Sequence, residues 1–261
     1  NVAQKLNNQG YKVTLDILGE HVIDKRVAEN IALKYSNLYQ KIDDMDLDCT
    51  ISVKPTHVGL SISLSEAISN VLNIVKQAKK FKNFLRLDME SSVHTAKTID
   101  IFKECLKVYE NIGIAIQAYL YRSLDDVNEL KGPNFNSRLC KGIYNEPKSL
   151  AYQSREDVRS NFILLAKSMA ISNSFCGYAT HDQDLIDRLL HWIKLEKIPS
   201  QLFEFQVLYG VPMGNRLEKL LEQGFDVRVY VPYGPDWFDY SIRRLKENPN
   251  IAKYVLSNYM K

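Results

Sequence analysis

The chain has 261 residues, 45% of them hydrophobic, so it can bury one sizeable core, whereas two full domains would be cramped. Its formal charge is only +3, from 34 basic and 31 acidic residues that are interspersed, which gives no electrostatic case for nucleic-acid binding. No run of apolar residues is long enough for a transmembrane helix, and the polar first residues do not form a signal peptide.

Eight strand-like runs follow one another along the chain, each followed by a helical pattern, and this alternation predicts a parallel sheet covered by helices. Their starts are spaced by roughly the 30 residues that a βαβ unit needs. The runs are 11–18, 49–54, 84–89, 113–119, 137–142, 175–181, 201–207 and 227–232. Eight units use up the chain, so we predict a single-domain α/β protein, a (βα)8 TIM-type barrel over residues 1–261. An open doubly wound sheet is the alternative.

Ordinary helix signals lie between these runs. Ser65 and Glu66 open a helical run that ends at Lys80, Gly113 follows the helix after Thr95, and Gly224 closes the last helix as a terminal glycine.

Several of the strands alternate apolar and polar residues, although strands of an all-parallel sheet normally read as continuous apolar runs. Because side chains alternate between the two faces of a strand, an apolar phase that packs on the helices turns the polar phase into the barrel. The residues of the polar phase are Lys54, Arg86, Asp88, Glu90, Gln117, Arg138, Glu204, Gln206, Arg228 and Tyr230. Unpaired buried charges are costly, so the set predicts either an internal salt-bridge network or a bound polar ligand, and we favour the ligand.

Polar residues also lie late in their strands, at the end where barrel enzymes build their sites. They are Lys54, Asp88, Gln117, Lys141, His181 and Gln206.

The cysteines and histidines show no metal-binding spacing. Cys49, Cys105, Cys140 and Cys176 form no CxxC pair and read as reduced, small core residues, which is typical of a cytoplasmic protein. The five histidines show no HExxH pairing, so we expect no metal.

Several longer stretches of the chain combine these polar residues with a distinctive local sequence. They are SVKPTHVG (52–59), RLDMESS (86–92), IQAYLYRS (116–123), RLCKGIYNEP (138–147), ATHD (179–182), FEFQVLYGVP (203–212), and VYVPYG with YSIRRLKENP (229–234, 240–249). Taken together, these stretches resemble the proline dehydrogenase family, in its monofunctional bacterial form or as the catalytic module of the proline utilisation enzymes. The matches keep the family's order and touch seven of the eight strands. The opening VTLDILGEHV (13–22) also resembles the start of the monofunctional type.

The resemblance implies an enzyme that oxidises L-proline to pyrroline-5-carboxylate by hydride transfer to FAD, the first step of proline catabolism. It also implies a quinone as electron acceptor and leaves open peripheral association with the inner face of the cell membrane. FAD would lie at the carboxyl-end face without a Rossmann domain, and the eleven glycines indeed include no GxGxxG and no P-loop pattern.

The resemblance further implies site residues by position. Cofactor contacts would come from Asp88, Gln117, Arg138, Lys141, Gly142, Thr180, His181 and Glu247. The proline carboxylate would be held by Lys54, Arg243 and Arg244, with Tyr144, Leu208, Tyr230 and Tyr240 around the ring. Lys54, Asp88, Tyr230, Tyr240, Arg243 and Arg244 would form the catalytic set.

The chemistry suits these residue types. Guanidinium groups orient a carboxylate through charge-assisted, often bidentate hydrogen bonds, and donors such as Arg138 and Gln117 could stabilise charge on a reduced flavin. The substrate amine must lose a proton first, and no residue is an obvious base. Asp88 is a candidate by location, but it equally suits a structural acceptor role.

Several alternatives stay open. Arg138 could simply pair with Glu204 or Asp88, His181 could be a packing residue, and Lys141 a surface charge. A cofactor-free lyase or isomerase barrel would use Lys54 or Lys141 as a Schiff base, and a ligand-binding module would perform no chemistry. Hydroxyproline is the nearest variant substrate, which Tyr230 would crowd.

Overall fold

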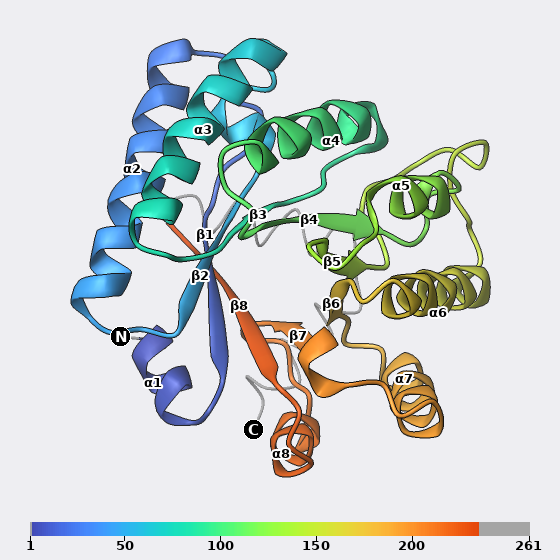
Figure 1. Cartoon of the computed structure of the whole chain (residues 1–261). Coiled ribbons are helices and arrows are strands. Elements are labelled where there is room, and N and C mark those ends of the chain that lie inside the picture. The colour runs from blue at the N-terminus through green and yellow to red at the C-terminus, as the bar shows by residue number, and fades with distance from the viewer. Residues whose placement is uncertain (1, 235–261) are drawn as a thin grey trace, which may run out of the picture.

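Eight parallel strands close into a barrel in the computed structural model, which describes residues 2–234 (Figure 1). Each strand pairs with the next along the chain, and β8 closes the barrel against β1. The strands are β1 (Lys12–Ile17), β2 (Cys49–Val53), β3 (Leu85–Leu87), β4 (Ile112–Gln117), β5 (Asn136–Cys140), β6 (Phe175–Ala179), β7 (Phe203–Leu208) and β8 (Val227–Tyr233). All eight predicted runs are therefore confirmed as strands, and closure rules out the open sheet.

The helices surround the barrel on its outer side, as Figure 1 shows. They are α1 (Val2–Asn8), α2 (Lys25–Asp44), α3 (Leu64–Lys80), α4 (Ser92–Leu106), α5 (Ser123–Leu130), α6 (Arg155–Ile171), α7 (Gln183–Leu195) and α8 (Arg216–Glu222), with 3-10 turns η1 (Pro55–Val58) and η2 (Ser200–Leu202). None of the helices in residues 2–234 combines the length and the apolar character needed to cross a bilayer.

The helix ends mostly follow the sequence signals. The Ser63 hydroxyl accepts from the Glu66 N–H and begins α3 next to the predicted start. Gly224 follows α8 with φ +79°, the left-handed conformation that glycine adopts without strain. Gly113 follows α4, which ends at Leu106, and lies within β4, in agreement with the predicted strand-like run 113–119. The sequence analysis also missed α1, which buries Ala3 and Leu6 in the core.

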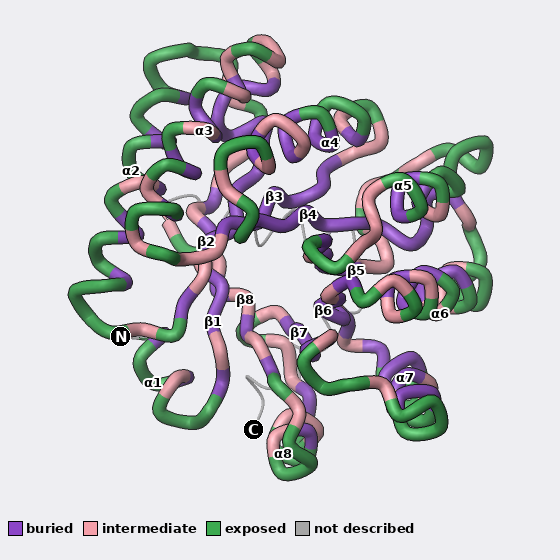
Figure 2. The backbone as a smooth tube through the Cα atoms, viewed as in Figure 1, coloured by how far each residue is buried: buried purple, intermediate pink, exposed green. Residues whose placement is uncertain are grey.

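The apolar phase of the alternating strands packs outward on the helices, as predicted, and β3 is an example. Leu85 and Leu87 are almost fully buried in the main hydrophobic cluster, while Arg86 between them points the other way and bonds Asn136 of β5, past β4. Figure 2 shows this division, with the barrel and the inner helix faces buried and the outer helix faces exposed. The interior of the barrel is therefore polar.

Small residues make room for the long polar side chains inside. A Cβ at Gly113 would lie 2.8 Å from Arg86 Nη1, and a Cβ at Gly177 would lie 2.2 Å from Gln206 Nε2. Strands β4 and β6 thus supply space that side chains from β3 and β7 fill.

Candidate active site

A cavity of about 310 Å³ opens at the carboxyl ends of the strands. All the predicted site residues within the described range line it, namely Lys54, Asp88, Gln117, Arg138, Lys141, Gly142, Tyr144, Thr180, His181, Leu208 and Tyr230. Tyr240, Arg243, Arg244 and Glu247 lie outside the described residues. Seven strands, or the loops that follow them, converge on this one space, which is the usual site position in a barrel of this kind.

Asp88, which follows β3, belongs to the cavity floor, by which we mean the part of the lining formed by Lys54, Asp88, Gln117 and Arg138. Its carboxylate accepts hydrogen bonds from Arg138, from the Ser52 hydroxyl at 2.6 Å and from the Tyr230 hydroxyl at 2.8 Å. Lys54 Nζ lies 3.9 Å away. Burial opposes ionisation of Asp88, but the charges of Arg138 and Lys54 and these hydrogen bonds outweigh burial and lower its pKa. Asp88 is therefore a saturated, ionised acceptor.

Arg138 spans the cavity floor from β5. Its Nε donates to Gln206 Oε1 at 2.8 Å, its Nη1 bonds Asp88, and its guanidinium lies 4.8 Å from the centre of the Tyr230 ring. Its Nη2 is buried and has no hydrogen-bond partner within residues 2–234, and the same holds for Gln117 Oε1. Buried polar atoms are rarely left unpaired, so these two atoms point to a polar ligand.

Below this floor, towards the amino ends of the strands, a second set of charges is fully occupied. Arg86 Nη2 donates to Asn136 Oδ1 at 2.6 Å, and its Nη1 reaches two backbone carbonyls. Glu204 accepts from Arg228 Nε at 2.7 Å and from Gln206 Nε2 at 2.6 Å. None of Arg86, Glu204 and Arg228 lines the cavity. Here the salt-bridge interpretation is correct for Glu204 and Arg228, whereas Arg86 is held by neutral acceptors, and the ligand interpretation is wrong for all three.

Glu90 was also placed in the barrel by its phase, and this was wrong. It comes after β3 and accepts from the backbone N–H of Thr56 at 2.9 Å and from the Thr56 hydroxyl. It therefore anchors the η1 turn that follows Lys54.

The surroundings of two predicted site residues at the rim, His181 and Gly142, explain their residue types. His181 Nε2 accepts from the Leu208 N–H at 2.9 Å, and burial lowers the pKa of His181 to about 4, so its imidazole is neutral and Nδ1 carries the proton. Gly142 has φ +109°, and a Cβ there would lie 2.2 Å from the Tyr119 ring. Only glycine fits this position.

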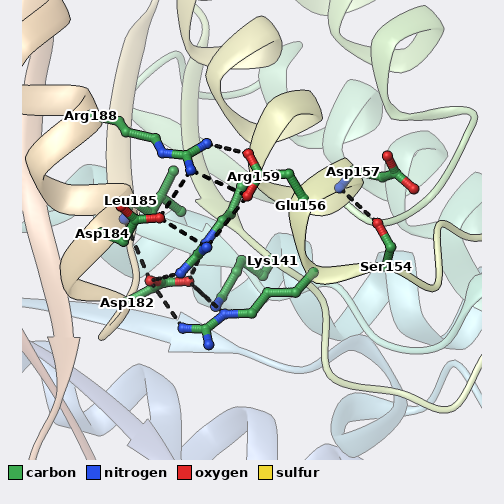
Figure 3. Close-up of polar contacts among 10 residues, drawn as sticks. Lys141, Ser154, Glu156, Asp157, Arg159, Asp182, Asp184, Leu185 and Arg188 are labelled. Atoms are coloured by element: carbon green, nitrogen blue, oxygen red, sulfur yellow. Dashed lines mark hydrogen bonds and ion pairs between the residues drawn. The ribbon is translucent and has the colours of Figure 1, made fainter.

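Lys141 is held at the rim by a cluster of charges between α6 and α7 (Figure 3). Its Nζ lies 2.9 Å from Asp182 Oδ2, and the same carboxylate accepts from Arg159 Nη2 at 2.7 Å. Asp182 also caps α7 by accepting from the Leu185 N–H. Burial opposes ionisation of Asp182, but these cations hold its pKa well below the usual range. The cluster fixes the two loops that carry Lys141 and His181.

Sequence reasoning missed several residues that line or support the cavity. Ala115 and Ala179 line it between longer neighbours. Cys140, which the strand phase does place inward beside Arg138, lies on its wall, and burial raises the pKa of its thiol to about 11. Asp16, inside β1, is fully buried and pairs with Lys54. The period-two rule that placed Lys54 inward would have found Asp16 as well, on the same face as Lys12 and Thr14.

Comparison with known proteins adds the family context. The family model described as proline dehydrogenase matches residues 1–256. Proline dehydrogenase 2 of Bacillus subtilis strain 168 is 38% identical over 250 residues, covering 95% of this chain and 82% of that protein. The proline dehydrogenase of Deinococcus radiodurans is 31% identical over 263 residues, covering 99% of this chain and 84% of that protein.

Solved structures share the fold. The proline utilization A (PutA) protein of Bdellovibrio bacteriovorus, inactivated by N-propargylglycine, superposes with a TM-score of 0.85 at 23% identity, over 94% of this chain and 30% of that one. PutA of Corynebacterium freiburgense gives a TM-score of 0.79 at 20% identity, over 96% and 30% of the two chains. This chain therefore has the fold of one part of these much longer proteins.

Proposed function

The chain belongs to the proline dehydrogenase family, and on that premise we propose that it oxidises L-proline to pyrroline-5-carboxylate with FAD as the hydride acceptor. The observation that carries the proposal is the cavity at the carboxyl ends of the strands, whose wall contains the residue types that the reaction needs. We further propose that residues 1–261 form one catalytic domain.

The polar floor of the cavity fits a flavin. Arg138 Nη2 and Gln117 Oε1 are a donor and an acceptor that are buried and unpaired in the described part of the chain, and a flavin ring carries both hydrogen-bonding types along one edge. Gly142 lines the same cavity, where its missing side chain accommodates the Tyr119 ring, and Lys141 adds a cation at the rim. When bound, FAD supplies the acceptor for the hydride from the carbon beside the ring nitrogen of proline.

The chain's residues would hold this cofactor along the side of the cavity formed by β3 to β6. Asp88, Gln117, Arg138, Lys141, Gly142, Thr180 and His181 would contact it, joined by Glu247. The fixed guanidinium of Arg138 stabilises negative charge that develops during the reaction, which is a preorganised electrostatic contribution of about 3 kcal/mol. Because His181 is neutral with Nε2 occupied, it can offer only the N–H of Nδ1.

The substrate would lie between the cofactor and the side of the cavity formed by β2 and β8. Lys54 holds the proline carboxylate, together with Arg243 and Arg244. Tyr144, Leu208 and Tyr230, with Tyr240, surround the ring, and Tyr230 crowds an added hydroxyl, so proline is preferred to hydroxyproline. Since Asp88 is ionised and already accepts from three donors, it orients Arg138 and Tyr230 and is a poor base.

We also propose that a quinone takes the electrons, at the inner face of a membrane with which the protein associates peripherally. Support for this acceptor comes from the family alone.

The absorption spectrum of the purified protein tests cofactor and reaction together. We expect an oxidised-flavin spectrum that bleaches when L-proline is added anaerobically. A colourless protein, whose Lys54 or Lys141 is trapped by borohydride with a carbonyl compound, would instead favour a Schiff-base enzyme. A flavin spectrum that proline leaves unchanged would favour a ligand-binding module.

A further inference from the structure

Asp16 is a buried carboxylate directly behind the cavity wall. Its Oδ2 accepts from Lys54 Nζ, and its Oδ1 accepts from the Tyr35 hydroxyl of α2 at 2.9 Å. Its side chain has no exposure, whereas Lys54 lines the cavity with 10% of its side chain exposed. One ammonium group therefore connects the cavity to a carboxylate that solvent does not reach.

Other charged and titratable groups also face Asp16. They are Asp88 after β3, Arg138 on β5, Tyr35 on α2, and Tyr230 and Tyr233 on β8. Within residues 2–234, Lys54 is the cation that bonds Asp16, because Arg138 pairs with Asp88. Burial raises the pKa of Asp16 although Lys54 lowers it, whereas the pKa of Asp88 is lowered. Of the two carboxylates around Lys54, Asp16 is thus the one that takes a proton first.

A substrate carboxylate that enters the cavity competes for the same ammonium. Before it enters, the described floor is balanced, with Asp16 and Asp88 against Lys54 and Arg138. When Lys54 turns to the substrate, Asp16 loses its cation in a fully buried place. An isolated buried carboxylate is so unfavourable that it binds a proton instead.

We propose that Asp16 is a positioning residue for carboxylate binding, which directs the Lys54 ammonium at the cavity and takes up one proton when a bound carboxylate takes over that ammonium. In this step one O–H bond forms on Asp16, and no electrons move. With proline, the proton can come from the substrate ammonium, which must break one N–H bond before oxidation. The inference rests on the proposed function, since it assumes that Lys54 binds the substrate carboxylate.

Proton uptake can be measured with cyclopentanecarboxylate, which keeps the ring and carboxylate of proline and has no amine. Titration calorimetry of the flavin-loaded full chain, in two buffers of different ionisation enthalpy, gives the number of protons taken up per ligand. We expect close to one proton above neutral pH, and a Kd that rises up to tenfold per pH unit. For Asp16→Asn we expect uptake near zero and a Kd that hardly changes with pH.

Tyr35→Phe is the matched control, because it removes another hydrogen-bond partner of Asp16 and leaves the Lys54 pair in place. We expect this variant to keep its proton uptake. Proton uptake that persists in Asp16→Asn would overturn the proposal. So would binding of cyclopentanecarboxylate to the wild type without proton uptake, or a failure of cyclopentanecarboxylate to bind at all. The wild-type measurement decides alone if Asp16→Asn does not fold. Proline that still bleaches the flavin would show that the proposed function survives such a result.

Discussion

The barrel interior has two layers of polar side chains, a lower one towards the amino ends of the strands and an upper one at the cavity. They contain the same kinds of side chain but differ in function. In the lower layer Glu204 and Arg228 pair with each other, Arg86 bonds Asn136 and backbone carbonyls, and none of the three lines the cavity. In the upper layer Arg138 and Gln117 each keep a buried atom unpaired within the described residues, beside a cavity. A charged barrel interior is therefore not a sign of function by itself. The sign is incomplete pairing near the carboxyl ends of the strands.

The largest effect on stability is expected in the lower layer. Glu204→Leu leaves the largely enclosed Arg228 guanidinium without its carboxylate, and we expect the free energy of unfolding to fall by about 3 kcal/mol. Denaturant unfolding measures this change. Asp226→Asn, which breaks the exposed pair with Lys12, is the control and should cost less than about 1 kcal/mol. Equal losses in the two variants would mean that the lower layer is not a buried network.

Substitutions in the upper layer should mainly lower the catalytic rate. Arg138→Lys keeps the charge but loses the forked donors, and we expect kcat for proline to fall about 10²- to 10³-fold. Steady-state kinetics per bound flavin measures the loss. Arg86→Lys makes the same change one layer below and should leave kcat nearly unchanged. If the two variants lose kcat equally, the functional distinction between the layers is wrong.

Gln206 joins the layers, since it accepts from Arg138 and donates to Glu204. Gly177→Ala would place a Cβ 2.2 Å from its Nε2, and we expect a cost of about 1–3 kcal/mol together with a lower kcat. Thermal unfolding and kinetics on the same sample test this coupling. Gly132→Ala, where a Cβ meets no atom within 4 Å, should change neither quantity.

The smallest effect concerns pH at the rim. Folding lowers the pKa of His181 from about 6.5 to about 4, so the unfolded chain binds the extra proton between these values. The stabilising contribution is full above pH 6.5 and is lost as pH falls towards 4, by about 1 kcal/mol after allowance for partial exposure. His181→Asn should flatten this part of the stability curve. An unchanged acid slope in urea titrations would contradict the assignment.

Whether a feature of the fold or the site could be predicted from the sequence depends on how far apart in the chain the interacting residues are. Strand alternation is local, so the eight strands and the inward direction of Asp88 and Arg138 follow from it. Pairing is not local: Arg138 meets Asp88 across 50 residues and Tyr230 meets Asp88 across 142, through a register that no short pattern encodes. For this reason the sequence could not separate saturated charges from unsaturated ones. It also could not predict that Gly113 makes room for Arg86.

The small residues at the cavity ends of β4 and β6 allow the shape of the cavity to be changed. Ala115 and Ala179 line the cavity as single methyl groups, while the charged chemistry comes from other strands. Enlarging either alanine would reshape the chamber without deleting a charged group, so the selectivity for ring size and substituents could change independently of the catalytic apparatus.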